Sequence, residues 1–233
     1  MNWQTREDYL KQFPMEIPYK AFDRYGDILL DWNERMNLTR IIDENDMMDK
    51  HFIDSLTPTL LDAYEGTGKI LDLGTGAGFP GMVLAMVSPQ REVHLMDSLN
   101  KRITFLDHVV DELGLTNVKT FHGRAEEAGR SNRFREQYGL VISRAVARLP
   151  ILAEYCLPFV YLGGHFVAMK GAEGVDETEE AKRAIEILGG KLEEVADLKL
   201  PGGDERHLVV VKKVKATPAK YPRGGGKPRK DPL

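Results

Sequence analysis

The sequence predicts an α/β fold, in which a mostly parallel, seven-stranded sheet is covered by helices and preceded by a helical region. Short apolar segments alternate with helix-length connections from residue 69 onward, which is typical of parallel strands joined by crossover helices. Only residues 201–205 separate the last two apolar segments, a connection that allows a hairpin but no crossover helix. The sheet is therefore expected to end in an antiparallel pair. In the first 65 residues, apolar side chains instead recur at spacings of three and four, which indicates helices.

The chain is expected to have three parts. These are an N-terminal helical cap (residues 1–65), an α/β domain (66–213) and a basic tail rich in Pro and Gly (214–233). In the cap, an apolar stripe from Tyr19 to Trp32 predicts a helix that ends near Asn33. A second helix is expected over residues 46–63, where Pro58 should break or kink it.

The α/β domain is expected to begin after a loop at residues 65–68 and to contain seven strands and four helices. The strands are predicted near residues 69–73, 92–97, 117–122, 139–143, 163–169, 191–199 and 206–213. The helices are predicted near residues 79–88, 99–114, 149–158 and 176–189.

Composition excludes several classes of protein. With 42% apolar and 29% charged residues, the chain has the make-up of a soluble globular protein rather than a disordered or fibrous one. No apolar run approaches the ~20 residues that a membrane-spanning helix needs, and the first residues lack the apolar core of a signal peptide. The single cysteine, Cys156, allows neither an internal disulfide nor a zinc site built on cysteine pairs. The protein is therefore expected to be cytoplasmic, with no membrane partner.

Charge is distributed unevenly along the chain. The last 22 residues hold eight Lys and Arg against one acid, a net charge of +7, so the first 211 residues carry −11 of the total of −4. This asymmetry favours a local contact with a polyanion over a general nucleic-acid coat. The tail lacks apolar periodicity and is expected to be extended or disordered by itself. It either keeps the protein soluble or contacts RNA.

A glycine-rich loop follows the first predicted strand. Gly74, Gly76 and Gly78 let the chain turn tightly and let a ligand approach the backbone, so they are candidates for cofactor binding. The next strand ends at Asp97, about 20 residues further on, where a carboxylate can accept hydrogen bonds from ribose hydroxyls. This arrangement predicts a site for an adenosine-containing cofactor beyond the carboxyl ends of the strands.

Two cofactors compete for this loop. Residues 76–81 satisfy the GxGxxG pattern of nicotinamide-dependent oxidoreductases, although a bare match of that kind is weak. Asp72 instead gives the form seen in Rossmann-like class I methyltransferases, where the acid can face the amine-bearing end of S-adenosylmethionine (SAM). The final antiparallel hairpin is also typical of the methyltransferase sheet. SAM is therefore expected, with a nicotinamide-dependent oxidoreductase as the alternative and a SAM- or RNA-binding regulator without turnover as a third hypothesis.

Positions after the third and fourth strands support the same site. Residues 123–126 follow the third strand, where such enzymes hold the adenine, so Ala125 and Glu126 are further cofactor-binding candidates. Arg144 follows the fourth strand at the mouth of the methyl-donor pocket and is the candidate catalytic residue. Taken alone, Glu126 could be an acid at the start of a helix, and Arg144 could belong to a surface ion pair.

The sequence also limits the methyl acceptor. Enzymes of this class that methylate exocyclic amines usually carry Asn/Asp-Pro-Pro-aromatic after the fourth strand, where residues 143–147 here are Ser-Arg-Ala-Val-Ala. Carbon-5 methylation of pyrimidines needs a thiolate, and the apolar surroundings of Cys156 predict a core residue instead. The six histidines show no metal-ligand spacing, so no metal is expected. Guanine N7 fits, because its lone pair attacks the methyl group directly and no proton has to leave.

The chain resembles the bacterial small-subunit rRNA guanine-N7 methyltransferases, also called glucose-inhibited division protein B, over almost its whole length. The resemblance is carried by Trp32–Thr39, His51–Leu56, Leu73–Gly81, Asp97–Arg102, Ser143–Ala147 and Lys220–Arg223 with Pro228. It implies a monomeric SAM-dependent enzyme that methylates N7 of one guanine in the 530 loop of 16S rRNA, free or in the small ribosomal subunit.

The resemblance also implies roles for individual residues. Gly74 and Phe79 would line the SAM pocket, Ala125 and Glu126 would contact the adenosine end, and Arg144 would close the site. Asp97 would accept hydrogen bonds from the ribose hydroxyls of SAM. Candidates for RNA contacts are Asn37, Arg40, His51, Lys101, Arg102 and Arg223. Basic side chains among them would contact phosphates, which positions RNA without reading its sequence. Alternatively, Asn37 and Thr39 end a helix and His51 packs locally.

Overall fold

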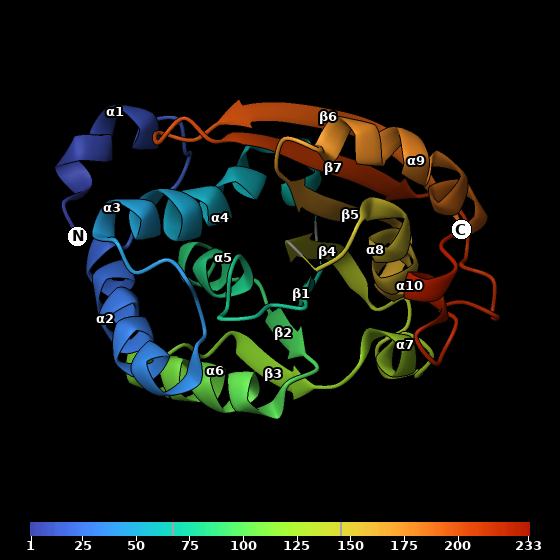
Figure 1. Ribbon diagram of the computed structural model, residues 1–233, viewed down its shortest axis with the longest axis horizontal. Coiled ribbons are helices and arrows are strands. Elements are labelled where there is room, and N and C mark those ends of the chain that lie inside the picture. The colour runs from blue at the N-terminus through green and yellow to red at the C-terminus, as the bar shows by residue number, and fades with distance from the viewer. Residues whose placement is uncertain (67, 145) are drawn as a thin grey trace.

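The computed structural model describes residues 1–66, 68–144 and 146–233 (Figure 1). Thr67, in the expected boundary loop, and Ala145, after the fourth strand, lie outside the described residues. The seven predicted strands are β1 (Ile70–Leu73), β2 (Val93–Asp97), β3 (Val118–His122), β4 (Tyr138–Arg144), β5 (Val160–Lys170), β6 (Gly190–Lys199) and β7 (Glu205–Lys213). The four predicted helices are α5 (Gly81–Val87), α6 (Asn100–Leu113), α8 (Leu149–Cys156) and α9 (Gly174–Ile187). Sequence reasoning missed the short α7 (Ala125–Ala128).

The strands form one sheet in the order β3-β2-β1-β4-β5-β7-β6. Strands β1 to β5 are parallel, whereas β7 is inserted between β5 and β6 and runs antiparallel to both. The predicted hairpin of β6 and β7 is thereby confirmed. Because β1 has β2 on one side and β4 on the other, the chain order reverses at β1, and a crevice is expected at the carboxyl ends of these strands.

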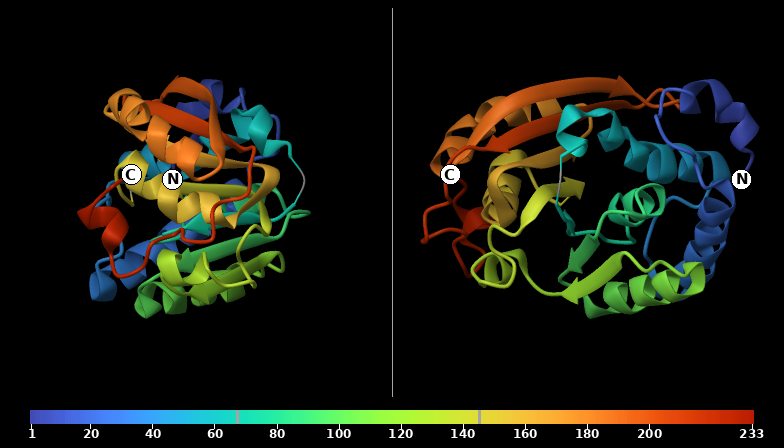
Figure 2. Two further views of the ribbon diagram at one scale, coloured as in Figure 1. Left: turned by 90° about the vertical axis from the view of Figure 1, so that its right-hand side faces the viewer. Right: turned by 180° about the vertical axis from the view of Figure 1, so that it is seen from behind.

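Side chains on the sheet alternate between two apolar cores, one on each face. On one face, Ile70 and Leu95 pack with the cap, α5 and α6. On the other face, Leu71 and Val141 pack with α8 and α9, and Cys156 is fully buried there as predicted. β1 and β2 are buried along their whole length, as expected for central parallel strands covered on both faces (Figure 2). None of the helices in the described residues is long and apolar enough to cross a membrane.

The cap is built from helical segments, as predicted. They are a 3-10 turn (Trp3–Arg6), α1 (Glu7–Leu10), α2 (Tyr19–Met36), α3 (Glu44–Met47), a π-helical stretch (Met48–Ile53), α4 (Asp54–Leu56) and two further 3-10 turns (Thr57–Leu60 and Asp62–Tyr64). The apolar stripe forms α2, which ends when Asn37 adopts a left-handed conformation with φ of 48°. Pro58 lies where the second helix changes from α4 to a 3-10 turn, because proline has no N–H to donate to the main-chain oxygen four residues earlier.

The C-terminal segment, residues 214–233, is folded against the α/β domain, which differs from the extended or disordered tail that its composition suggests. Arg135 donates hydrogen bonds to the main-chain oxygens of Thr217 and Tyr221, at 2.7 and 2.8 Å. The segment ends in α10 (Lys227–Lys230), which lies against α8 (Figure 2). Composition could not reveal this, because side chains far earlier in the chain satisfy these main-chain groups.

Candidate active site

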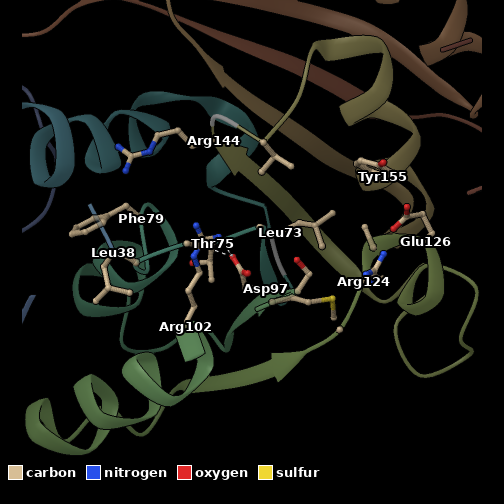
Figure 3. Close-up of a pocket in the computed structure, with 18 of the residues that line it drawn as sticks. Leu38, Leu73, Thr75, Phe79, Asp97, Arg102, Arg124, Glu126, Arg144 and Tyr155 are labelled. Atoms are coloured by element: carbon tan, nitrogen blue, oxygen red, sulfur yellow. Dashed lines mark hydrogen bonds and ion pairs between the residues drawn. The ribbon is translucent and has the colours of Figure 1, made fainter. Parts of the chain in front are cut away.

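A cavity of about 630 Å³ opens at the carboxyl ends of β1 to β4 (Figure 3). Such a volume suits a ligand of cofactor size. The predicted residues that line it are Gly74, Gly76, Phe79, Asp97, Ala125, Glu126 and Arg144, together with the RNA candidates His51 and Arg102. Other lining residues include Leu38, Leu73, Thr75, Met96, Ser98, Arg124, Val146, Tyr155, Gly226 and Arg229. Thr75, Met96 and Ser98 flank predicted residues in sequence, whereas no local pattern points to Tyr155 or Arg229.

The glycine loop exposes its backbone to the cavity. Gly74 has φ of +74°, a conformation that favours glycine, and its N–H donates to the main-chain oxygen of Met96 at 2.8 Å. A Cβ at Gly74 would lie 2.5 Å from Cγ2 of Val146, so a side chain there would displace the cavity wall. A Cβ at Gly76 would meet no atom within 4 Å. Gly76 therefore borders open space that a ligand can fill.

Gly78, also a predicted cofactor residue, lies outside the cavity lining. A Cβ at Gly78 would overlap the hydroxyl of Tyr25 on α2 and would lie 2.9 Å from Cδ2 of Leu106 on α6. The structure thus gives this glycine a packing role, since it lets two helices approach the loop. Spacing alone cannot separate a glycine needed for a ligand from one needed for packing.

Asp72 is hydrogen-bonded to the glycine loop and does not line the cavity, although the sequence suggested that it faces the cofactor. Its Oδ2 accepts hydrogen bonds from Oγ1 of Thr75 at 2.6 Å and from the N–H of Gly81 at 2.7 Å. Burial raises the pKa of Asp72 to about 6, against the lowering effect of these two bonds. The carboxylate therefore fixes the loop to the start of α5.

Asp97, at the end of β2, is joined to the same loop. Its carboxylate accepts hydrogen bonds from the N–H groups of Gly76 and Leu99, at 3.0 and 2.9 Å. Arg102, on α6, donates to Oδ2 of Asp97 at 3.0 Å (Figure 3). Arg102 is therefore an ion-pair partner of Asp97 inside the cavity rather than a free surface cation.

The two ends of the cavity differ in chemistry. At one end lie Arg124, which directly precedes α7, Glu126 of α7 and Tyr155 of α8 (Figure 3). Burial raises the pKa of Tyr155 and nearby Glu126 raises it further, while Arg229 opposes them. This end combines an aromatic ring, a carboxylate and two guanidinium groups, and it is the end that the sequence assigns to adenosine.

Arg144 occupies the other end, where β4 meets the cap (Figure 3). Its Nη1 donates to the main-chain oxygen of Lys50 at 2.7 Å and to Oδ2 of Asp54 at 2.8 Å. Its guanidinium carbon lies 5.6 Å from the ring centre of Phe79. The side chain is therefore held in one orientation at the mouth of the cavity.

His51 is a buried, neutral neighbour of Arg144. Its ring stacks on Phe79 with 4.4 Å between the ring centres, and its Nε2 lies 2.9 Å from Oγ1 of Thr39. Burial and then the charge of Arg144 lower the pKa of His51 to about 3. Since the ring carries no charge near neutral pH, it cannot act as a cationic phosphate contact.

The structure does not bring the remaining RNA candidates to one surface. Asn37 and Arg40 are exposed after α2, and Nζ of Lys101 donates to the main-chain oxygen of Met36 at 3.1 Å, so these three lie around the end of α2. Arg223 instead pairs with the buried Glu154, with 2.7 Å between Nη2 and Oε2.

The sheet order with its inserted antiparallel strand, the glycine loop after β1 and the acid at the end of β2 together define a Rossmann-like class I methyltransferase. The chain belongs to the family described as rRNA small subunit methyltransferase G, whose model matches residues 18–209. It is 47% identical to the ribosomal RNA small subunit methyltransferase G of Clostridium tetani, over 94% of this chain and 92% of that protein. The enzyme of the same name from Lachnoclostridium phytofermentans is 52% identical, over 92% of this chain and 89% of that protein.

Solved structures of methyltransferases share the fold. A mutant of the 16S rRNA (adenine(1408)-N(1))-methyltransferase from Catenulisporales acidiphilia, solved with cosubstrate SAM, matches with a TM-score of 0.53 at 13% identity, over 67% of this chain and 93% of that chain. The precorrin-6y C5,15-methyltransferase from Geobacter metallireducens GS-15 matches with a TM-score of 0.53 at 14% identity, over 69% of this chain and 87% of that chain. The nicotinamide-dependent oxidoreductase alternative is therefore not supported.

Proposed function

We propose that the protein transfers the methyl group of SAM to N7 of a guanine in the 530 loop of 16S rRNA, in the cytoplasm. The observation that carries this proposal is the cavity at the carboxyl ends of β1 to β4, in a chain that belongs to the rRNA small subunit methyltransferase G family. The printed names of the relatives from Clostridium tetani and Lachnoclostridium phytofermentans support an rRNA substrate.

The residues present fit SAM. Gly76 leaves open space beside the loop, and Asp97 and Glu126 supply carboxylates that can accept hydrogen bonds from ribose hydroxyls or an amino group. When bound, SAM supplies a methyl group activated by its sulfonium. The protein has to hold that methyl group in line with the acceptor nitrogen.

Guanine N7 requires little further chemistry from the protein. Its lone pair lies in the plane of the purine and carries no proton, so no general base is needed. Arg144, held by Asp54 and by the main-chain oxygen of Lys50, can donate a hydrogen bond to a purine carbonyl oxygen. Burial keeps the pKa of the Cys156 thiol well above its ordinary value, which argues against a thiolate nucleophile. Direct methyl transfer to a nitrogen needs neither a general base nor a thiolate nucleophile.

The experiment that tests the proposal supplies methyl-labelled SAM with 16S rRNA, free and in small subunits that lack the modification. After digestion to nucleosides, labelled 7-methylguanosine is expected. Gly74→Asp, which sets a side chain and a charge against the cofactor, should abolish the label while the protein still folds. If SAM binds but no nucleoside is labelled, the rRNA substrate is wrong. If SAM does not bind at all, the cofactor is wrong.

A further inference from the structure

The C-terminal segment is fixed to the α/β domain just before it reaches the cavity. Glu154 of α8 is 1% exposed, and its carboxylate accepts hydrogen bonds from the main-chain N–H and from Nη2 of Arg223, both at 2.7 Å. Nε of Arg130 donates to the main-chain oxygen of Pro222 at 2.7 Å. Charge-assisted bonds to a buried carboxylate hold this part of the chain in one place.

Beyond this anchor the chain turns back toward the cavity. Gly225 and Gly226 adopt φ of 66° and 69°, which lets the chain reverse before α10. Arg223 also contacts the end of this reversed segment, because its Nη2 donates a hydrogen bond to the main-chain oxygen of Asp231 at 2.8 Å. One guanidinium therefore fixes the start and the end of residues 223–231.

The turn brings Gly226 and Arg229 into the lining of the cavity, beside Tyr155 and Glu126. A Cβ at Gly226 would meet no atom within 4 Å, so this glycine borders open space. The anchor and the cavity contact use adjacent residues of α8, since Glu154 holds Arg223 and Tyr155 faces Arg229. The family model ends at residue 209, so this wall comes from a segment that the model does not include.

We propose that the C-terminal segment forms one wall of the SAM site and that Arg229 binds the adenosine moiety. The proposal rests on the proposed function for the cofactor. A guanidinium is planar and weakly hydrated, so it stacks on an aromatic face and donates to ring nitrogens better than an ammonium does. Two basic side chains of the segment then make contacts inside the protein, Arg223 with Glu154 and Arg229 at the cavity.

The test is calorimetric titration with SAM, S-adenosylhomocysteine and 5′-methylthioadenosine, the last of which has the adenosine but no amino-acid group. Arg229→Ala should weaken the binding of all three ligands by about two- to fivefold, the range of an exposed guanidinium contact with an aromatic ring. Arg229→Lys should restore only part of the loss. Lys230→Ala, which removes an equal charge from the same short helix and does not line the cavity, should bind all three like the wild type.

Two further measurements separate the contact from folding. A chain ending at Arg223, which keeps the Glu154 anchor, should bind the three ligands at least as weakly as Arg229→Ala while its unfolding transition stays cooperative. In the full chain, SAM should slow amide hydrogen exchange in residues 224–230.

The outcomes distinguish this inference from the proposed function. If the wild type binds none of the three ligands, the proposed function fails. If the wild type binds them and Arg229→Ala binds equally well, only the inference fails. A loss for SAM without a loss for 5′-methylthioadenosine would place Arg229 at the amino-acid end and overturn the adenosine assignment. Unchanged ligand binding with weaker rRNA binding would identify Arg229 as an RNA contact instead.

Discussion

Arg144 and Asp54 lie 90 residues apart in the sequence and form an ion pair with 2.8 Å between Nη1 and Oδ2. Only 2% of the Asp54 side chain is exposed, and its Oδ1 accepts a hydrogen bond from Nε of Arg206 at 3.0 Å. One buried carboxylate therefore pairs with two guanidinium groups. It also joins the helical cap to β4 and β7, so the orientation of the candidate catalytic arginine depends on the cap.

Asp54→Ala should slow methyl transfer by about tenfold to a hundredfold, because Arg144 loses the group that orients it. It should also lower the free energy of unfolding by roughly 3–5 kcal/mol, since a broken buried pair leaves uncompensated charge. Single-turnover rates and urea unfolding measure the two effects. The control is Asp31→Ala, which removes a carboxylate from the exposed pair with Arg35 and should change stability by less than about 1 kcal/mol. Equal behaviour of the two variants would contradict the positioning role of Asp54.

Two glycines of one loop should respond differently to the same substitution. Gly76→Ala places a methyl group in open space at the cavity, so SAM binding should weaken by about tenfold, with a stability loss of about 1 kcal/mol from the positive φ. Gly78→Ala should lower stability by a further 1–3 kcal/mol or so, because its Cβ overlaps the hydroxyl of Tyr25. SAM titration and urea unfolding of both variants check the difference. The reverse order of the two stability losses would contradict these assignments.

Local patterns were enough to predict the strands, the final hairpin and the acid at the end of β2. Each of these features depends on a short stretch of sequence, either on its apolar periodicity or on the length of one connection. Such patterns can be recognised without knowing the tertiary structure. The sequence also predicted that Arg144 lies at the mouth of the cavity, where the structure places it at the end of β4, and its catalytic role stays a prediction.

The features that could not be predicted from the sequence depend on contacts between residues that are far apart in the chain. Gly78 looks like its neighbours in the loop, yet Tyr25, from the distant helix α2, fills the space above it. Asp72 faces Thr75 and Gly81 rather than the cavity, because those donors reach its carboxylate directly. The C-terminal segment has the composition of a flexible tail, but its order comes from Glu154 and other residues of the α/β domain.

Tyr25→Phe should lower the free energy of unfolding by about 1–3 kcal/mol, because the buried hydroxyl donates to the main-chain oxygen of Ala77 and that oxygen would lose its partner. The stacking of residue 25 on Phe79 should persist, since the ring remains. SAM binding should weaken by a few-fold, as the glycine loop loses one support. Tyr19→Phe, at a half-exposed position on the same helix, is the control and should leave both properties unchanged. An unchanged free energy of unfolding for Tyr25→Phe would show that this bond contributes nothing.

The low pKa of His51 predicts how stability depends on pH. In the unfolded chain this histidine has its ordinary pKa near 6.5, whereas burial and Arg144 lower the pKa to about 3 in the folded protein. Between these values the unfolded state binds a proton that the folded state excludes. Its contribution to stability is therefore complete above pH 6.5 and is lost, by at most about 1.4 kcal/mol per pH unit, as the pH falls toward 3.

Urea unfolding of the wild type and His51→Gln at pH 7, 6, 5 and 4 measures this dependence. The wild type should lose stability more steeply than the variant, because glutamine does not titrate. Asp72 acts with the opposite sign between about pH 4 and 6, since its pKa is raised when folded, but it does so in both proteins and cancels in the difference. Parallel curves would mean that His51 is protonated in the folded protein, and Arg144 would then face a second positive charge at the mouth of the cavity.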